Sequence, residues 1–326
     1  MKRDGFTITM IFLAESANYG EGINNVSSLK KMTRGNDWQY SYISRQAMRY
    51  NIVQQANWDN TPVQAQKKVV QFAPSATIKD YPEIDMFGYM KTTSKGDEKE
   101  KGGATTRSAV VRLSNAIALE PFQGNLEFLT NAGLAVRQKL ENGIAQSEIH
   151  RSYYAYTVSI DLDRVGVDGE IDIPSQEKAE RVKVLLDSLH YLYRDIRGRR
   201  ENLSPLFIIG GRYQRKNPFF ENRIKLEGNK INVETLLELI EDNEIEENTV
   251  VGITSGIFDN ETEIKATKNA HIKDGVAMTK FMYWLKTNIG KIEMDELSIS
   301  NKLLEFRKQQ PNFKDISFLS IHCILL

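Results

Sequence analysis

The chain has 326 residues, of which 40% are hydrophobic, and its 43 basic residues are balanced by 43 acidic ones. This length suits one large domain or two smaller ones. Zero net charge excludes a protein whose whole surface is basic, as in histone-like proteins, but it does not exclude a local basic groove that binds nucleic acid. The single cysteine excludes an internal disulfide framework, and no apolar run approaches the roughly 18 residues of a membrane span, so we expect a cytoplasmic protein.

The N-terminal region begins with a short apolar strand, predicted over residues 6–14 from its β-branched and aromatic composition. A polar stretch rich in Gly and Asn follows over residues 15–40 and predicts a long loop, which in a compact domain is usually functional. Ser41 or Ser44 then offers an N-cap for a helix that runs to about Asn57.

The same region has a local excess of positive charge. Between residues 30 and 49 there are five basic residues and one acidic residue, and Arg45 and Arg49 lie one turn apart on one helical face. Guanidinium groups bind phosphates through two donors, and short polar side chains donate to phosphates and sugars. The pattern predicts a surface for a phosphate backbone, formed by Asn24, Asn25, Ser28, Lys30, Lys31, Arg34, Ser44, Arg45, Gln46 and Arg49.

Two insertions interrupt the strand pattern that follows. Residues 58–105 lack a clear periodicity and contain the charged segment 94–103, which we expect to be a mobile loop. Alternation resumes over residues 107–119 and predicts a strand. Residues 122–152, which contain several glycines, predict an excursion from the sheet.

A second series of elements lies between residues 153 and 213. Residues 153–164 alternate as a strand, a helix begins near Pro174 and ends at Gly198, and residues 206–213 predict a buried strand. The chain order strand, helix, strand, strand, helix, strand is the ferredoxin-like pattern of RNA-recognition modules. The predicted fold class is therefore α+β, with an RRM-like palm. The palm comprises residues 1–57, 106–121 and 153–214.

Basic residues also follow the last predicted strand. The turn after Gly210 and Gly211 carries Arg212, Arg215 and Lys216, and glycines at a strand end let another backbone approach closely. These three cations are a second set of candidate phosphate contacts.

The remainder of the chain, residues 215–326, is predicted to be a mixed, largely helical extension packed on the palm. Helices are expected over residues 232–242 and near residues 275–290. The apolar end, residues 317–326, is either a buried last strand or the product of an interrupted reading frame.

Five short segments occur in series between residues 5 and 215. They are residues 17–22, 44–49, 85–89, 111–119 and 154–166. Together they resemble the DevR-like family, the CRISPR-associated backbone subunits of type I-B Cascade surveillance complexes in the RAMP superfamily.

The resemblance implies a non-catalytic subunit that binds CRISPR RNA, assembles as several copies along it beside other Cascade subunits, and presents it for pairing with target DNA in antiviral defence. It also implies that residues 58–105 form fingers and that residues 122–152 form a thumb that reaches the neighbouring copy. The candidate thumb contacts are Phe128, Leu129, Leu134, Val136 and Ile144.

Two other functions stay open. One is a metal-dependent RNA endonuclease of the type III backbone kind, which uses an aspartate in the loop after the first strand, where this chain has Asp37. The other is a lone RNA-recognition module that stacks bases on Tyr154 and Tyr156. Asp161 and Asp163 suit a magnesium site by type, but in an RNA groove two carboxylates would repel the ligand. The four histidines are scattered, so we expect neither a metal nor a cofactor.

Overall fold

The computed structural model divides the chain into two compact units, residues 1–257 and 258–326. It describes residues 4–23, 25–35, 37–66, 69–92, 104–227, 230–242, 245, 248–253, 276–292 and 294–310. Helices and largely antiparallel sheets occur together in the first unit, which confirms a mixed α/β architecture. No helix in the described ranges combines the length and the apolar character of a membrane span.

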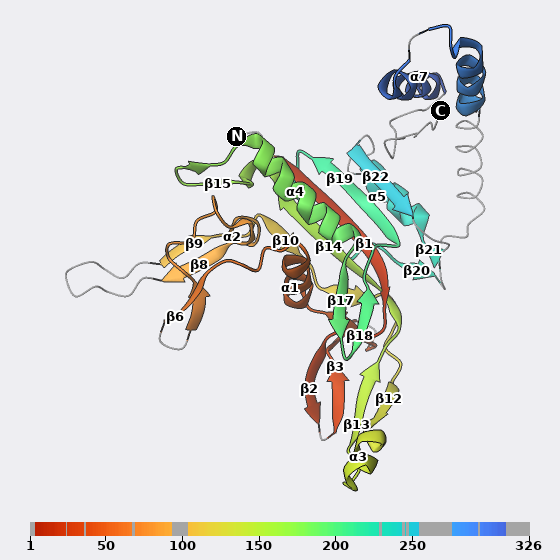
Figure 1. Ribbon diagram of the computed structural model, residues 1–326. Helices are drawn as coiled ribbons and strands as arrows, with labels where there is room; N and C mark the ends of the chain where they lie inside the picture. Colours follow the sequence, from red (N-terminus) through yellow and green to blue (C-terminus); the bar gives the residue numbers. More distant parts are fainter. Residues whose placement is uncertain are drawn as a thin grey trace, which may run out of the picture. The chain divides into compact units, whose positions relative to one another are not determined.

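An eight-stranded sheet forms the centre of the first unit (Figure 1). Its strands run in the order β22 (Thr249–Ile253), β19 (Phe207–Tyr213), β1 (Gly5–Ala14), β14 (Ser152–Asp161), β11 (Ala116–Ala118), β5 (Gln39–Ile43) and β4 (Lys31–Thr33), while β10 (Val111–Leu113) also pairs with β14. The apolar sequence of β1 is explained by its position, because β1 lies between β14 and β19, antiparallel to both, and is buried along nearly its whole length.

Two helices cover one face of this sheet, α1 (Arg45–Gln55) and α4 (Ser175–His190) (Figure 1). Alternate residues of β1 and β14 point toward them, so one core cluster contains Met10, Phe12, Tyr154 and Tyr156 from the strands. The same cluster contains Met48 and Ile52 of α1 and Leu185 and Leu189 of α4. The predicted first helix and its N-cap at Ser44 are confirmed.

The predicted end of α4 at Gly198 is wrong. The helix ends at His190, and the chain continues as a hairpin of β17 (Tyr193–Ile196) and β18 (Arg199–Asn202). Arg197 and Gly198 both have positive φ, 49° and 79°, as a two-residue hairpin turn requires. Tyr193 and Ile196 fit the apolar spacing of the helix by coincidence, because both residues belong to β17.

The predicted loop over residues 15–40 is also wrong, because most of it forms strands. β2 (Tyr19–Ile23) and β3 (Val26–Leu29) precede β4, and they join β12 (Asn125–Thr130) and β13 (Ile144–Ile149) in a second sheet of order β12-β13-β3-β2. The excursion over residues 122–152 is therefore not a free hairpin. A helix, α3 (Ala132–Gln138), connects its strands, and β13 pairs in parallel with β3.

The insertion over residues 58–105 contains two hairpins and a short helix. The hairpins are β6 (Val63–Gln66) with β7 (Val69–Phe72) and β8 (Tyr89–Thr92) with β9 (Ala104–Arg107), and the helix is α2 (Pro82–Phe87). Segment 94–103, predicted to be a mobile loop, lies outside the described residues. Gly88 ends α2 with a φ of 74°, and a Cβ there would overlap the Arg107 carbonyl.

A buried carboxylate joins α2 to the rest of the unit. Asp85, with a side chain 0% exposed, accepts from Arg107 at 2.6 Å and from Arg181 of α4 at 2.8 Å. Its oxygens also accept from the Gly166 amide at 3.0 Å. Because three segments distant in sequence converge on Asp85, this carboxylate links the insertion to Arg107, to Gly166 and to α4.

The region after β19 contains both strands and helices, as expected of a mixed extension. Short strands β20 (Leu226–Glu227) and β21 (Lys230–Ile231) precede α5 (Val233–Asp242), and β22 then extends the central sheet beside β19. In the second unit, residues 276–288 are helical, and α7 (Glu296–Lys308) begins with a capping box at Asp295. The predicted helices near 232–242 and 275–290 are confirmed, and residues 317–326 lie outside the described residues.

A buried histidine lies where β13 passes into β14. Ser41 Oγ lies 2.7 Å from His150 Nδ1 and 2.7 Å from the Tyr154 hydroxyl, which donates to the His150 carbonyl. Burial lowers the pKa of His150, against the opposing charge of Glu120. A neutral buried imidazole stabilises the fold above the ordinary pKa of about 6.5, and this contribution is lost as the pH falls.

We therefore expect the melting temperature of the protein to fall between pH 7.5 and pH 5.5, with part of the fall due to His150. In His150→Gln, which keeps a polar side chain that does not titrate, that part should vanish. Differential scanning calorimetry of both proteins at both pH values measures it. An equal fall in the two proteins would show that His150 does not contribute.

Candidate nucleic-acid interface

Three chain segments meet beside the first turn of α1. The Lys30 amide donates to the Asn18 carbonyl at 2.6 Å, the Asn18 amide donates to the Tyr42 carbonyl at 3.3 Å, and the Tyr42 amide donates to the Lys30 carbonyl at 3.0 Å. These backbone bonds fix the segment after β1 and the start of β4 next to the end of β5, directly before the helix. Asn18 and Lys30 are thereby brought to the residues that begin α1.

The helix start is capped by neutral side chains. Ser44 Oγ accepts from the Ala47 amide at 3.3 Å, and Asn18 Oδ1 accepts from the amide and the hydroxyl of Ser44, each at 3.2 Å. Asn115 Oδ1 accepts from the Arg45 amide at 2.9 Å. The first turn contains no acidic residue, so the partial positive charge of the helix N-terminus is not neutralised there.

The roles of two of these capping residues, Asn18 and Asn115, are not predicted from the sequence. Asn18 and Asn115 lie in two of the five family-like segments, but neither had been linked to the helix. An asparagine is a common capping residue, although its partner becomes evident only when distant segments are placed together.

The cations of α1 differ in their surroundings. Arg45 and Gln46 are exposed, and within the described ranges Arg45 has no ion pair. Arg49 is 35% exposed, lies over the Phe87 ring with 5.0 Å between guanidinium carbon and ring centroid, and pairs with Glu83 at 3.3 Å. We call Asn18, Lys30, Ser44, Arg45, Gln46 and Arg49 the α1 basic surface.

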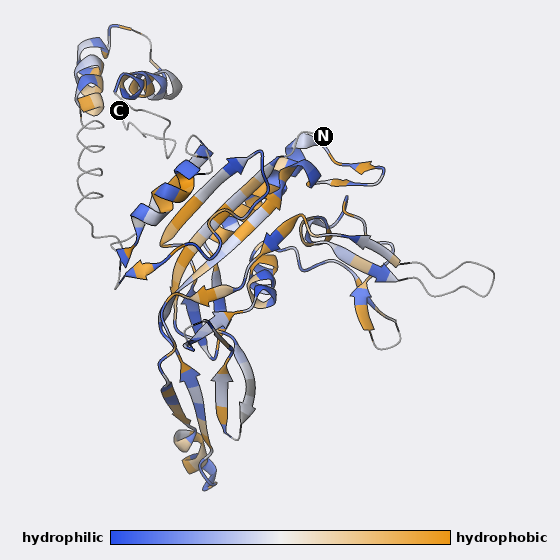
Figure 2. Ribbon diagram, turned by 180° about the vertical axis from the view of Figure 1, so that it is seen from behind, coloured by the Kyte–Doolittle hydropathy of each residue, from blue (hydrophilic) through white to orange (hydrophobic). Residues whose placement is uncertain are grey.

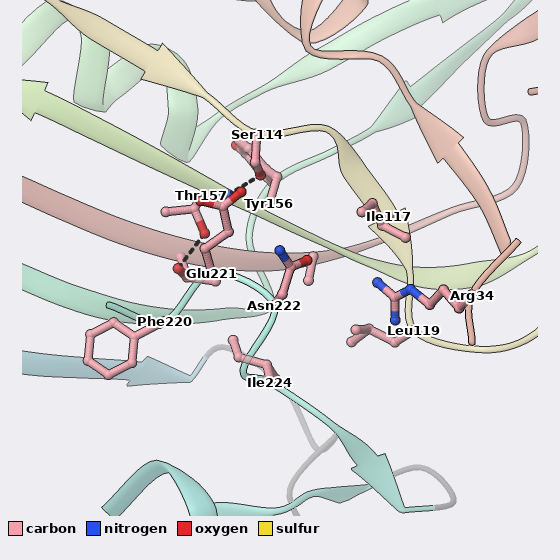
Figure 3. Close-up of a pocket in the computed structure, with 12 residues that line it drawn as sticks. Arg34, Ser114, Ile117, Leu119, Tyr156, Thr157, Phe220, Glu221, Asn222 and Ile224 are labelled. Carbon is pink, nitrogen blue, oxygen red and sulfur yellow. Dashed lines mark hydrogen bonds between the residues drawn. The ribbon is translucent and has the colours of Figure 1, made fainter. Parts of the chain in front are cut away.

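Other predicted contacts from the same region point elsewhere. Lys31 donates to both Glu148 oxygens at 2.9 Å and lies over the Phe122 ring, so its charge is neutralised at the base of the second sheet. Arg34 lies over the Tyr40 ring and lines a small hollow beneath the sheet that also includes Thr157 and Asn222 (Figure 3).

The predicted contacts in and beside the β2–β3 hairpin are only partly described. Ser28 is half-buried in β3, and Asn25 is exposed in the β2–β3 turn, where its carbonyl accepts from the Gln146 amide at 2.9 Å. Asn24 lies outside the described residues.

The cations after β19 lie at the other end of the central sheet. Arg212 is opposite Phe6, near the start of β1, whereas α1 follows the segments beyond the end of that strand. β1, β14 and β11 lie between β19 and β5, the strand that leads into α1, so the two sets of cations are not brought together. Arg212 pairs with Asp4 at 2.5 Å and Lys216 pairs with Asp163 at 2.5 Å, while Arg215 is exposed.

The acidic residues considered for metal binding are engaged by cations. Asp161 is buried and accepts from Arg112 at 3.0 Å and from Arg164 at 3.3 Å. Burial alone would raise the pKa of Asp161, but these arginines and Lys216 hold it below its ordinary value. Asp37 lies in the turn between β4 and β5 with a φ of 61°. In the described ranges no three His, Cys, Asp or Glu side chains cluster as metal ligands.

The tyrosines proposed to stack bases are inside the protein. Tyr154 and Tyr156 are 0% and 1% exposed, and Phe12 contacts both rings at centroid distances of 5.9 and 5.6 Å. A base cannot reach them, so the lone RNA-recognition module that stacks on these residues is contradicted. β14 turns Tyr154 and Tyr156 toward the helices because that face forms the core.

Apolar side chains are exposed on the second sheet and its connecting helix. Phe128 is 57%, Leu134 is 60% and Val136 is 77% exposed, and Leu129 and Ile144 are also exposed. Leu126 and Leu140 add to this set. We call these seven residues the thumb apolar surface; Figure 2 shows apolar residues on α3 at the end of this sheet. In the isolated chain these side chains are therefore not buried by packing within the hairpin.

Known proteins resemble this chain either in fold, over most of its length, or in sequence, over a short stretch. A solved structure described as "CRISPR RNA-guided surveillance complex, pre-nicking" matches with a TM-score of 0.52 and 12% identity, over 78% of this chain and 94% of the other. At this identity the likeness shows the fold alone.

Curated relatives share only a short stretch. The chain is 40% identical over 76 residues to Xaa-Pro aminopeptidase 1 of Dictyostelium discoideum, and 38% identical over 63 residues to aminopeptidase P2 of Arabidopsis thaliana. These matches cover 22% and 19% of this chain, which spans only 12% and 9% of the lengths of the two enzymes. No activity of those enzymes is therefore attributed to it.

A family model covers most of the chain. The model described as "CRISPR-associated negative auto-regulator DevR/Csa2" matches residues 6–234, which include every element of the α1 basic surface and the thumb apolar surface. The chain belongs to the CRISPR-associated DevR/Csa2 family.

Proposed function

We propose that this protein is a non-catalytic backbone subunit of a type I-B Cascade that binds CRISPR RNA at the α1 basic surface. The observation that carries the proposal is the start of α1. Its caps are neutral, its first turn has no acidic residue, and Arg45, Gln46 and the segment that carries Lys30 lie beside it. Helix N-termini and arginines both favour phosphate oxygens. Membership of the CRISPR-associated family supports RNA as the anionic partner.

Contacts of this kind are to the sugar-phosphate chain, so the protein would bind guides of any sequence. Specificity for target DNA would come from base pairing with the guide, while the protein holds the guide in place. The amide side chains of Asn18 and Gln46 would add hydrogen bonds to sugars or phosphates without reading a base.

Several copies would bind one guide side by side. The thumb apolar surface supports this part of the proposal, because its residues are exposed in one copy and would be covered by a neighbour. A contact between two different surfaces of identical copies produces a filament when its rotation does not close into a ring. Other Cascade subunits would cap the ends of that filament.

We expect Arg45 and Arg49, both replaced by Ala, to weaken binding of single-stranded RNA and to reduce its salt dependence. Each phosphate contact on a single strand contributes roughly 0.7 to the slope of log K against log salt, so on an RNA long enough for several neighbouring copies the slope should fall by about one to one and a half units. Fluorescence anisotropy at several salt concentrations measures it.

The matched control replaces Lys225 and Lys230 with Ala. Both are exposed, both lie at the β20–β21 hairpin, and the change in net charge is identical. An unchanged slope in the arginine variant, or an equal fall in the control, would contradict the assignment of RNA to the α1 basic surface.

A further inference from the structure

Arg49 is restrained by an acidic residue at the edge of the proposed RNA site. Its Nη2 donates to Glu83 Oε1 at 3.3 Å, and its guanidinium lies over the Phe87 ring. Glu83 is 14% exposed and Arg49 is 35% exposed, so the pair is accessible from solvent on the arginine side. Arg45, one turn earlier, lacks such a restraint within the described ranges.

The carboxylate of Glu83 is held in a fixed place. Glu83 and Phe87 belong to α2, and the same helix is anchored through Asp85 to Arg107 and Arg181. Gly88, whose φ and surroundings exclude any other residue, ends the helix. Glu83 is therefore not a loose surface acid that follows Arg49, because the helix that carries it is rigidly attached.

We propose that Glu83 is a specificity-determining residue, which occupies Arg49 as an internal substitute for a phosphate. This inference rests on the proposed function of the α1 basic surface. When a single copy binds a short RNA, Arg49 would stay paired with Glu83 and would contribute little to phosphate binding. RNA held firmly by neighbouring copies would displace the carboxylate. Glu83 thus lowers the affinity of isolated copies for unrelated RNA and makes stable binding depend on assembly.

The strength of the contact suits this role. A partly exposed ion pair of 3.3 Å contributes little to stability and yields readily to a better-placed anion. Removing the carboxylate should therefore strengthen RNA binding by about two- to fivefold. A residue that served only to support the fold would have the opposite effect or none.

The test uses the full chain, Glu83→Gln, and an oligouridine long enough for one copy. Glutamine keeps the size and a hydrogen bond but removes the charge. The dissociation constant should decrease about two- to fivefold, and the salt slope should rise by roughly 0.7 as Arg49 gains a phosphate. Asp172→Asn is the control, because it releases Lys178 from an exposed pair and changes net charge equally.

A double variant separates the specific effect from general charge. If Glu83 acts through Arg49, the gain from Glu83→Gln should disappear in an Arg49→Ala background. A gain that persists there, a gain of equal size in Asp172→Asn, or no gain at all would overturn the inference. If Arg45→Ala weakens binding but Glu83→Gln does not strengthen it, the RNA site stands and only this inference fails.

A second substitution covers the case in which the glutamine variant unfolds. Glu83→Asp keeps the charge but withdraws it by one methylene from Arg49, and it should give a smaller gain in the same direction. Thermal unfolding identifies which variants are folded. Weaker RNA binding by a folded aspartate variant would also overturn the inference.

Discussion

Replacement of Asp85 with Ala is expected to lower the free energy of unfolding by about 3–5 kcal/mol. The Asp85 carboxylate is the shared partner of Arg107 and Arg181, whose side chains are only 2% and 4% exposed. Without it, two buried guanidiniums face each other with incomplete compensation from Asp168 and Glu177. The Gly166 amide loses its acceptor as well. The expected loss of stability is large because two buried positive charges remain without full compensation. The ion pair with Asp85 need not itself be strongly stabilising.

Urea unfolding followed by circular dichroism measures the difference. Asp59→Ala is the control, because Asp59 is exposed and, among the residues that the structure describes, accepts only from Gln54. Its removal should change stability by less than about 0.5 kcal/mol. A loss below about 1 kcal/mol in Asp85→Ala would mean that the arginines find other partners, and the anchoring of the insertion through Asp85 would be wrong.

Phe128 and Val136, both replaced by Asp, are expected to abolish ordered assembly on RNA while the fold is retained. Both side chains are more than half exposed, so the isolated chain should tolerate the change. At an interface, each buried apolar side chain of this size contributes about 1.5–3 kcal/mol, and a buried unpaired carboxylate adds a penalty. Together they should weaken each contact between copies by at least about a hundredfold.

Mass photometry with a repeat-bearing RNA measures the number of copies bound. The unaltered protein should form species with several copies on one RNA, and the double variant should bind as separate copies. Leu237→Asp is the control, because Leu237 is an exposed apolar residue of α5 outside the thumb apolar surface. Multi-copy assembly that survives in the double variant would show that this surface is not the contact between copies.

The sequence predicts elements well where local pattern and tertiary burial agree. β1, α1 with its cap at Ser44, β14 and β19 follow from apolar periodicity and capping residues. Residues 15–40 were wrongly predicted to be a loop because glycine and asparagine are poor strand formers. Here pairing with β13, more than a hundred residues away, outweighs that local preference.

The candidate site was predicted in part. Ser44, Arg45, Gln46 and Lys30 are brought together, as the charge pattern indicated. The partners that decide which cations are available could not be predicted, because they come from distant segments. Glu148 neutralises Lys31, and Asp4 neutralises Arg212. The direction of each cation depends on strand register, which composition does not give.

Crosslinking of the full-length protein to an RNA that contains 4-thiouridine tests the central claim most directly. Mass spectrometry of the crosslinked peptides locates the RNA on the chain without any substitution. We predict crosslinks in peptides that contain Asn18, Lys30 or residues 44–49. Crosslinks confined to residues 212–216, with none at the start of α1, would contradict the proposed interface.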